Sequence, residues 1–170
     1  MARIDIDQAE VLGYLVRHLR RSLKLDQRRC FETLSPLLPE GFSPPGGDWF
    51  LTVAEGGGVF PLEDQHEQQC MESWSILLTV YTRVKLDRSG HDQQLMVDAS
   101  RGLLRLKKLV LQAVVGHDLT TDEESPDSAR SEFLRSMLHV NHCQRMEYDD
   151  RAGIGWITIE LGVEYDWDLS

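Results

Sequence analysis

The carboxyl-terminal segment GWITIELGVEYDWDLS, at 155–170, alternates apolar and polar side chains over nearly its whole length. Successive side chains of a β-strand point to opposite faces, so this alternation predicts a strand with one apolar and one acidic face. At about 3.3 Å per residue it spans on the order of 40 Å, which is long for a domain of this size. The apolar face holds Ile157, Ile159, Leu161, Val163, Tyr165 and Trp167, and the polar face holds Thr158, Glu160, Gly162, Glu164, Asp166 and Asp168.

Two segments have the apolar periodicity of amphipathic helices. The first helix is predicted over 7–25, where Asp7 and Glu10 form a start that resembles a capping box. The second is predicted over 95–115, with Asp98 as its N-cap. In both helices the apolar residues recur every three or four positions, which indicates packing on a common core.

Three further segments are predicted to be extended. A short strand is expected at 49–54, followed by a flexible turn at Gly56-Gly57-Gly58 and an extended or loop segment at 59–70. Residues 73–86 carry apolar side chains on both faces, which is typical of a central strand. Residues 140–148 read as a strand that forms a hairpin with the terminal strand.

Two segments lack a regular pattern. Residues 26–48 are rich in Pro and Gly, which break helices and strands, although Leu34, Leu37 and Leu38 are expected to pack as a short helical turn. Residues 117–131 are acidic and polar, as in a solvated loop. The order of elements predicts one α+β domain over 1–170, with a mostly antiparallel sheet flanked by two main helices.

Charge and cysteine usage narrow the class of protein. The chain has 18 basic and 28 acidic residues, a net charge of −10, which argues against nucleic acid or anionic membranes as partners. Cys30, Cys70 and Cys143 are scattered and are expected to be reduced thiols of an intracellular protein. The acidic start lacks the order of a signal peptide, and no apolar run approaches the roughly 20 residues of a membrane span.

No catalytic constellation is evident. His139, His142 and Cys143 resemble metal ligands, but in a strand His139 and Cys143 would share one face and His142 the other, so no metal site is expected. The acidic residues fall in a loop, a turn and the polar face of a strand, where solvated charge is the favoured reading. We therefore predict neither an enzyme nor a bound cofactor.

Four stretches together resemble the phage tail terminator proteins, also called tail completion or head–tail joining proteins. They are the helix AEVLGYLVRHLRRSL, the strand WSILLTVYTRVKL, the helix SRGLLRLKKLVLQAVV and the closing RAGIGWITIELGVEYDWDL. The resemblance covers most of the chain except 26–48 and 117–131, and it is one of element order without an invariant motif.

The resemblance implies a ring, typically of six copies, that caps the tail tube and joins it to the head connector. Its partners would be further copies, tail tube and head connector proteins, and it would lie in the virion tail or neck after assembly in the host cytoplasm. In this picture the polar face of the terminal strand contacts a neighbouring subunit, lines the lumen or faces outer solvent, and loops dock on the tube or connector. The residues assigned to the strand are Glu160, Glu164, Asp166 and Trp167, and those assigned to docking are Phe42, Trp49, Asp122 and Glu123.

Two other readings stay open. One is a small-ligand-binding or regulatory module, which requires an apolar pocket, for example between the helix at 98–115 and the sheet. The other is a hydrolase or metal enzyme centred on His139 and His142.

Overall fold

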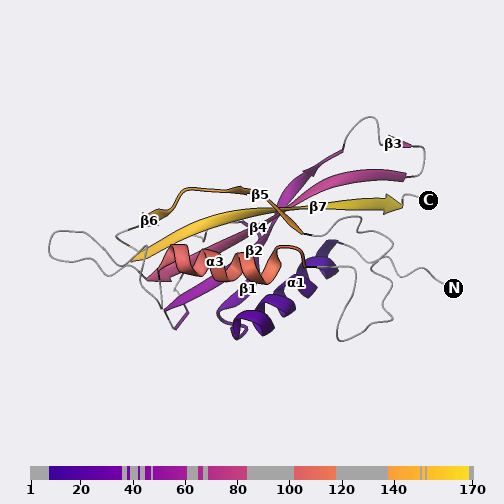
Figure 1. The fold of residues 1–170 in the computed structure, drawn as a ribbon. Coiled ribbons are helices and arrows are strands. Elements are labelled where there is room, and N and C mark those ends of the chain that lie inside the picture. The colour runs from indigo at the N-terminus through magenta and orange to yellow at the C-terminus, as the bar shows by residue number, and fades with distance from the viewer. Residues whose placement is uncertain are drawn as a thin grey trace.

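A computed structural model of the protein describes residues 8–35, 38, 42, 45–46, 48–60, 65–66, 69–83, 102–117, 138–149, 151 and 153–168. Two helices and seven strands lie in these residues (Figure 1). They are α1 (Gln8–Leu23), β1 (Cys30–Thr33), β2 (Trp49–Val59), β3 (Gln65–His66), β4 (Gln69–Arg83), α3 (Leu103–Val114), β5 (His139–Cys143), β6 (Glu147–Asp149) and β7 (Ile154–Asp168).

The strands form one mixed sheet. Its order is β1-β2-β4-β7-β5, with β3 paired to β4 and β6 paired to β7. β1 runs parallel to β2, and all the other described pairs are antiparallel. The predicted α+β class is thus confirmed.

The predicted terminal strand is β7, and it lies inside the sheet. It pairs with β4 along its full length, from Ile154 opposite Arg83 to Asp168 opposite Gln69. Its other side pairs with β5 and β6. β7 is long because it runs beside β4 from one end of that strand to the other. The far ends of both strands, together with β3, project beyond the two helices (Figure 1).

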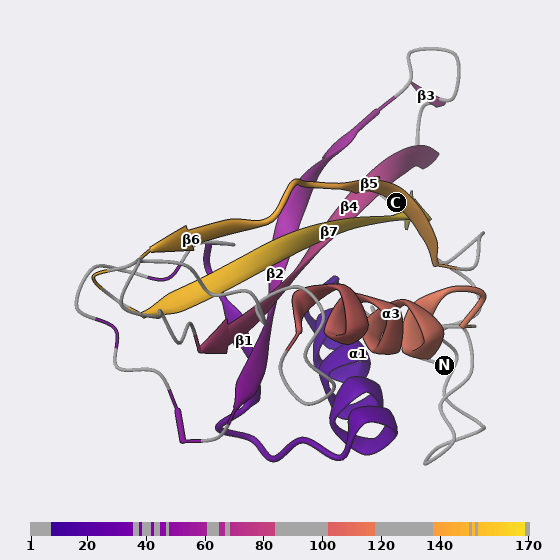
Figure 2. The same cartoon turned by 60° about the vertical axis from the view of Figure 1, so that its left-hand side comes forward.

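Both helices cover the same face of the sheet (Figures 1 and 2). The alternation predicted for β7 is confirmed, because its odd-numbered residues from Ile157 to Tyr165 all join the core beneath the helices. Trp74, Ile76 and Leu78 of β4 are wholly buried there. This inner face is the main hydrophobic core. Its helical members are Val11, Tyr14, Leu15, Val16 and Leu19 from α1, and Leu103, Leu106, Val110 and Val114 from α3.

The helices follow their predicted patterns with shifted bounds. α1 begins at Gln8 within the described residues, and its last turn carries Arg20 and Arg21, cations that the helix dipole favours. α3 begins after Gly102 and ends before Gly116, whose φ of 73° suits a glycine. The predicted caps Asp7 and Asp98 lie outside the described residues.

Two predictions in the amino-terminal half are wrong. The glycines at 56–58 are not a turn but the end of β2, where the register with β4 shifts between Glu55 and Gly58. A Cβ on Gly58 would lie 1.7 Å from a carboxylate oxygen of Glu72, so any larger residue here would displace the Glu72 side chain. The segment 26–48 contains strand β1, whose four residues pair in parallel with β2. Leu34 is exposed in a bend directly after β1 and does not belong to a helical turn.

The predicted strand 140–148 is two short strands, β5 and β6. The β5–β7 register shifts between Val140 and His142, which leaves Asn141 as an extra residue in the ladder. Each half of the segment pairs with a different part of β7.

The outer face of the sheet, opposite the helices, is covered at one end by a second cluster. Phe50, Tyr81 and Ile154 are buried there. The rings of Phe50 and Tyr81 are stacked with centroids 4.7 Å apart. The partly buried residues packed against them are Phe31, Leu38, Phe42 and Trp156.

Candidate functional site

The other end of the outer sheet face is partly open to solvent, and we call it the open face. It is formed where β4 and β7 pair Ser73 with Glu164, Ser75 with Gly162 and Leu77 with Glu160. These six positions face the side of the sheet away from the helices. Ser73 is exposed, the side chains of Ser75, Leu77, Glu160 and Glu164 are half-buried, and Gly162 is buried. The open face is therefore a mostly polar, half-buried surface with two carboxylates.

Glu160 lies at the centre of the open face and is half-buried. The hydroxyl of Ser75 donates a hydrogen bond to its Oε1 at 2.9 Å, and the Asn141 amide donates to the same atom at 3.4 Å. In the described part of the chain, no cation pairs with this carboxylate. A charged oxygen held only by neutral donors remains available to a cation from another molecule.

Gly162 lets side chains from the edge strand lie over the open face. A Cβ at Gly162 would stand 2.6 Å from His139 Nε2 and 2.7 Å from both the oxygen and nitrogen of the Asn141 side-chain amide. His142 is paired with Glu160 across the ladder. Without glycine at 162, His139 and Asn141 would have to move away from the strand.

The sequence pattern predicted wrongly which side chains of HVNHC, at 139–143, share a face of the strand. His139 is paired with Gly162 and His142 with Glu160, so both histidines lie on the outer side, whereas Cys143 packs against the main core. The extra residue at Asn141 causes the change, because it shifts the alternation by one position. Within the described residues, no group of three or more His, Cys, Asp and Glu side chains could hold a metal ion.

The residues predicted for the terminal strand follow its alternation. Glu164 is half-buried on the open face. The backbones of Asp166 and Trp167 pair with Met71 and Cys70, but their side chains lie outside the described part of the structure.

The structure describes two of the four residues predicted to dock on the tube or connector. Phe42 is half-buried, and its ring packs on Phe31 and Phe50 at about 6 Å between centroids. Trp49 is half-buried at the start of β2, with the Arg29 guanidinium 5.8 Å from its ring centroid. Asp122 and Glu123 lie outside the described residues.

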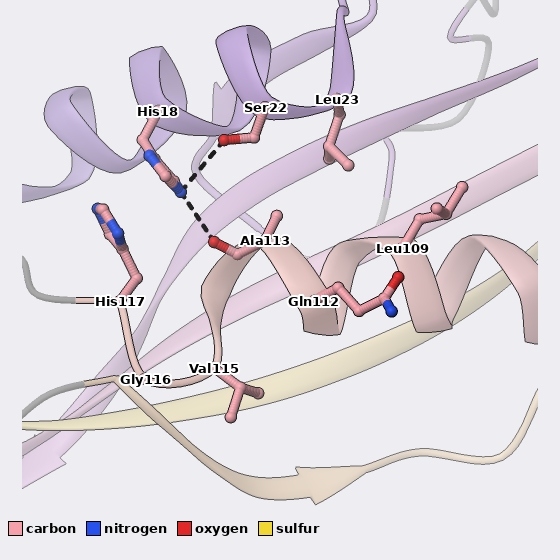
Figure 3. A pocket seen from close by; sticks show the side chains of 9 residues that line it. All are labelled: His18, Ser22, Leu23, Leu109, Gln112, Ala113, Val115, Gly116 and His117. Carbon is pink, nitrogen blue, oxygen red and sulfur yellow. Dashed lines mark hydrogen bonds between the residues drawn. The ribbon is translucent and has the colours of Figure 1, made fainter.

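A cleft of about 470 Å³ lies between α1 and α3 (Figure 3). The imidazoles of His18 and His117 stack at 3.6 Å between centroids, and His18 Nε2 donates to the Ala113 carbonyl at 2.8 Å. Ser22 Oγ lies 3.4 Å from the same nitrogen. The ligand pocket expected between the second helix and the sheet is a different place, since that contact is filled by core side chains.

A second groove, of about 390 Å³, runs along the exposed flank of α3, and we call it the α3 groove. Two of its residues are apolar and open to solvent, with Leu104 46% and Val115 55% exposed. It also holds two lysines that have no hydrogen-bond or ion-pair partner in the described part of the chain. The residues that line it are Leu104, Lys107, Lys108, Leu111, Gln112 and Val115.

Among the described residues, two buried groups have a pKa raised well above its ordinary value, and neither lies on the open face or in the α3 groove. Burial raises the pKa of the Cys30 thiol from 9.0 to about 12, although the Arg20 charge opposes the shift. Burial likewise raises the pKa of Tyr81 to about 12, against hydrogen bonds that lower it. Both shifts keep the groups neutral, as packing residues require.

Reasoning from the sequence missed the neighbours of Glu160. Ser75 and Gly162 are far from one another along the chain and meet only through the β4–β7 register. The α3 groove did leave a signal, because Leu104, Leu111 and Val115 form a second apolar stripe beside the core row of that helix.

Comparisons with known proteins do not assign a family. No family model matches the sequence. No curated protein matches it either. Among solved structures, the chain is similar to one described as "Virion of native gene transfer agent (GTA) particle", with 13% identity and a TM-score of 0.47, over 92% of this chain and 97% of that chain. That similarity is too low to assign a family or a function. None of the described helices is long and apolar enough to cross a membrane.

Proposed function

We propose that this protein is a structural subunit of a phage-like virion, and more specifically a tail terminator. In this role its copies form a ring that caps the tail tube and joins it to the head connector. The observation that carries the proposal is the layering of the molecule around β7. Helices cover one face of this strand, and the face that holds Glu160 and Glu164 is only half-buried.

The geometry of the open face suits protein contacts better than catalysis. A ligand site usually encloses its ligand in a concave, mostly apolar pocket, whereas the open face is mostly polar. A ring needs two different surfaces on each subunit that fit one another head to tail. The open face and the α3 groove are two such surfaces, and they belong to opposite sides of the sheet.

The finer assignments belong to the same proposal. The ring would hold about six copies and would sit in the tail or neck of the virion, after assembly in the host cytoplasm. The loops that dock on the tube or connector would contain Phe42, at the covered end of the outer face, Trp49, which packs against the main core, and Asp122 and Glu123.

Sedimentation velocity and negative-stain imaging of the purified protein, alone and mixed with candidate tail tubes, test the proposal. We expect closed rings, and tubes whose growth stops at a defined end when the protein is added. A monomer at every concentration, with tubes that elongate unchanged in its presence, would contradict the proposal.

A second candidate function is a small-ligand-binding module without catalysis. The cleft between α1 and α3 favours it, because His18, Ser22 and His117 bring polar groups to a concave site (Figure 3). Thermal-shift screening against a broad set of polar small molecules tests this reading. A melting temperature that no ligand raises would count against it.

A further inference from the structure

We infer that the α3 groove of one copy docks on the open face of the next copy. The inference rests on the proposed function, because it names the surfaces through which the subunits of the ring meet. It assigns Glu160 to a contact between subunits and not to the wall of a lumen.

The α3 groove has the composition of an unoccupied contact. Leu104 and Val115 are exposed, and Leu111 lies between them along the same flank of the helix. Side chains at these spacings share one face of a helix, so they form a continuous apolar strip. Burying such a strip against a second surface removes apolar area from water, which favours association.

The positive charges of α3 indicate a partner surface of negative charge. The helix contains Arg105, Lys107 and Lys108 and no acidic residue, in a chain whose net charge is −10. None of the three cations has a hydrogen bond or an ion pair in the described part of the chain. Because the rest of the chain is strongly acidic, a second copy is a partner of complementary charge.

The open face offers the matching charge and some apolar area. Glu160 is held only by the neutral Ser75 and Asn141, so its negative charge is not neutralised within the described residues. Leu77 lies directly opposite Glu160 on β4 and is half-buried, which adds apolar area beside the carboxylate. A sheet face commonly packs on a helix, and here the helix would come from the neighbouring copy.

The two surfaces predict a head-to-tail contact. They consist of different residues and lie on opposite sides of the sheet, so each copy uses its α3 groove toward one neighbour and its open face toward the other. Such a heterologous contact generates a ring if the rotation between copies closes. The contact therefore provides the kind of geometry that the proposed function needs.

Charge reversal tests the pairing directly. One variant carries Lys107→Glu and Lys108→Glu, and the other carries Glu160→Lys. In sedimentation velocity we expect the wild type to assemble and each variant alone to lose at least about tenfold in association constant, since like charges then face one another. An equimolar mixture of the two variants should recover assembly, because every contact in an alternating ring again joins opposite charges.

Two further variants separate charge pairing from misfolding and from a general charge effect. The double substitution Lys24→Glu and Arg28→Glu changes the net charge by the same amount at exposed positions outside both surfaces, and it should assemble like the wild type. Leu104→Glu places a carboxylate in the apolar strip and should prevent assembly while circular dichroism stays unchanged.

The outcomes distinguish this inference from the proposed function. Assembly of the wild type together with undiminished assembly of both charge variants would overturn the inference and leave the proposed ring intact. Loss of assembly in both variants without recovery in the mixture would also overturn the pairing. A wild type that stays monomeric with tubes present would remove the proposed function, and the inference with it.

Discussion

The buried Cys30 contributes to the packing of the core and not to chemistry. Its thiol is wholly buried beneath α1, and Arg20 Nε donates to its carbonyl oxygen at 2.8 Å. The pKa of the thiol is raised to about 12 because a thiolate would lose its hydration there. The neutral thiol therefore behaves as a small apolar side chain, and we assign it no redox role.

The thiol of Cys30 should make the protein sensitive to base. A group whose pKa is raised in the folded state contributes its stability fully below the unfolded pKa, here 9.0, and loses it as the pH rises toward about 12. Between pH 8 and pH 10.5, urea unfolding of the wild type should lose about 1–2 kcal/mol more stability than Cys30→Ala.

The control for this measurement is Cys143→Ala. It should keep the additional loss of stability at high pH, because Cys30 is still present. Equal losses in the wild type and in Cys30→Ala would contradict the assignment of the alkaline effect to the buried thiol.

At the scale of elements, α3 has two apolar sides with different roles. Leu106 is 1% exposed and packs in the main core. Leu109 is 38% exposed and borders the cleft between the helices. Replacing each leucine by alanine changes helix propensity by the same amount, so the difference between the two variants measures the contribution of core packing.

Leu106→Ala should lower the free energy of unfolding by about 3 kcal/mol, because it leaves a cavity under the sheet. Leu109→Ala should cost less than about 1 kcal/mol, since most surface substitutions have small effects. Urea or thermal unfolding of the two variants measures the difference. Similar costs at the two positions would mean that α3 does not pack as described.

At the scale of the whole molecule, charge is unevenly distributed. The chain is acidic overall, yet α3 presents only cations. General repulsion between acidic copies would oppose association, whereas a contact between α3 and the open face would favour it. Salt screens both interactions. Added salt should therefore strengthen association if repulsion dominates and weaken it if the attraction between α3 and the open face dominates.

Raising the NaCl concentration from about 50 mM to about 500 mM should therefore weaken self-association if the inferred contact dominates. Sedimentation equilibrium at several salt concentrations measures the change in the association constant. The variant carrying Lys107→Glu and Lys108→Glu should not show this weakening. Association of the wild type that strengthens with salt would indicate that repulsion dominates and that the contact is mainly apolar.

Several features followed from the sequence alone because their cause is local. The alternation of β7 and the helical spacing in α1 and α3 depend only on which side chains share a face, so they were readable from residue order. The α+β class followed from the order of these elements. The residues of β7 in the main core, from Ile157 to Tyr165 at odd positions, were predicted, whereas Thr158 on the predicted polar face is also buried.

Other features depended on strands that meet across long stretches of chain, so only the tertiary structure decided them. Pairing with β4 and β5 placed β7 inside the sheet and brought Ser75 and Asn141 to Glu160. The extra residue in β5 reversed the facing of His142, and pairing with β4 made Gly58 part of a strand, where its missing side chain leaves room for Glu72. No local pattern encodes a register between distant strands, because register is set by the fit of whole surfaces.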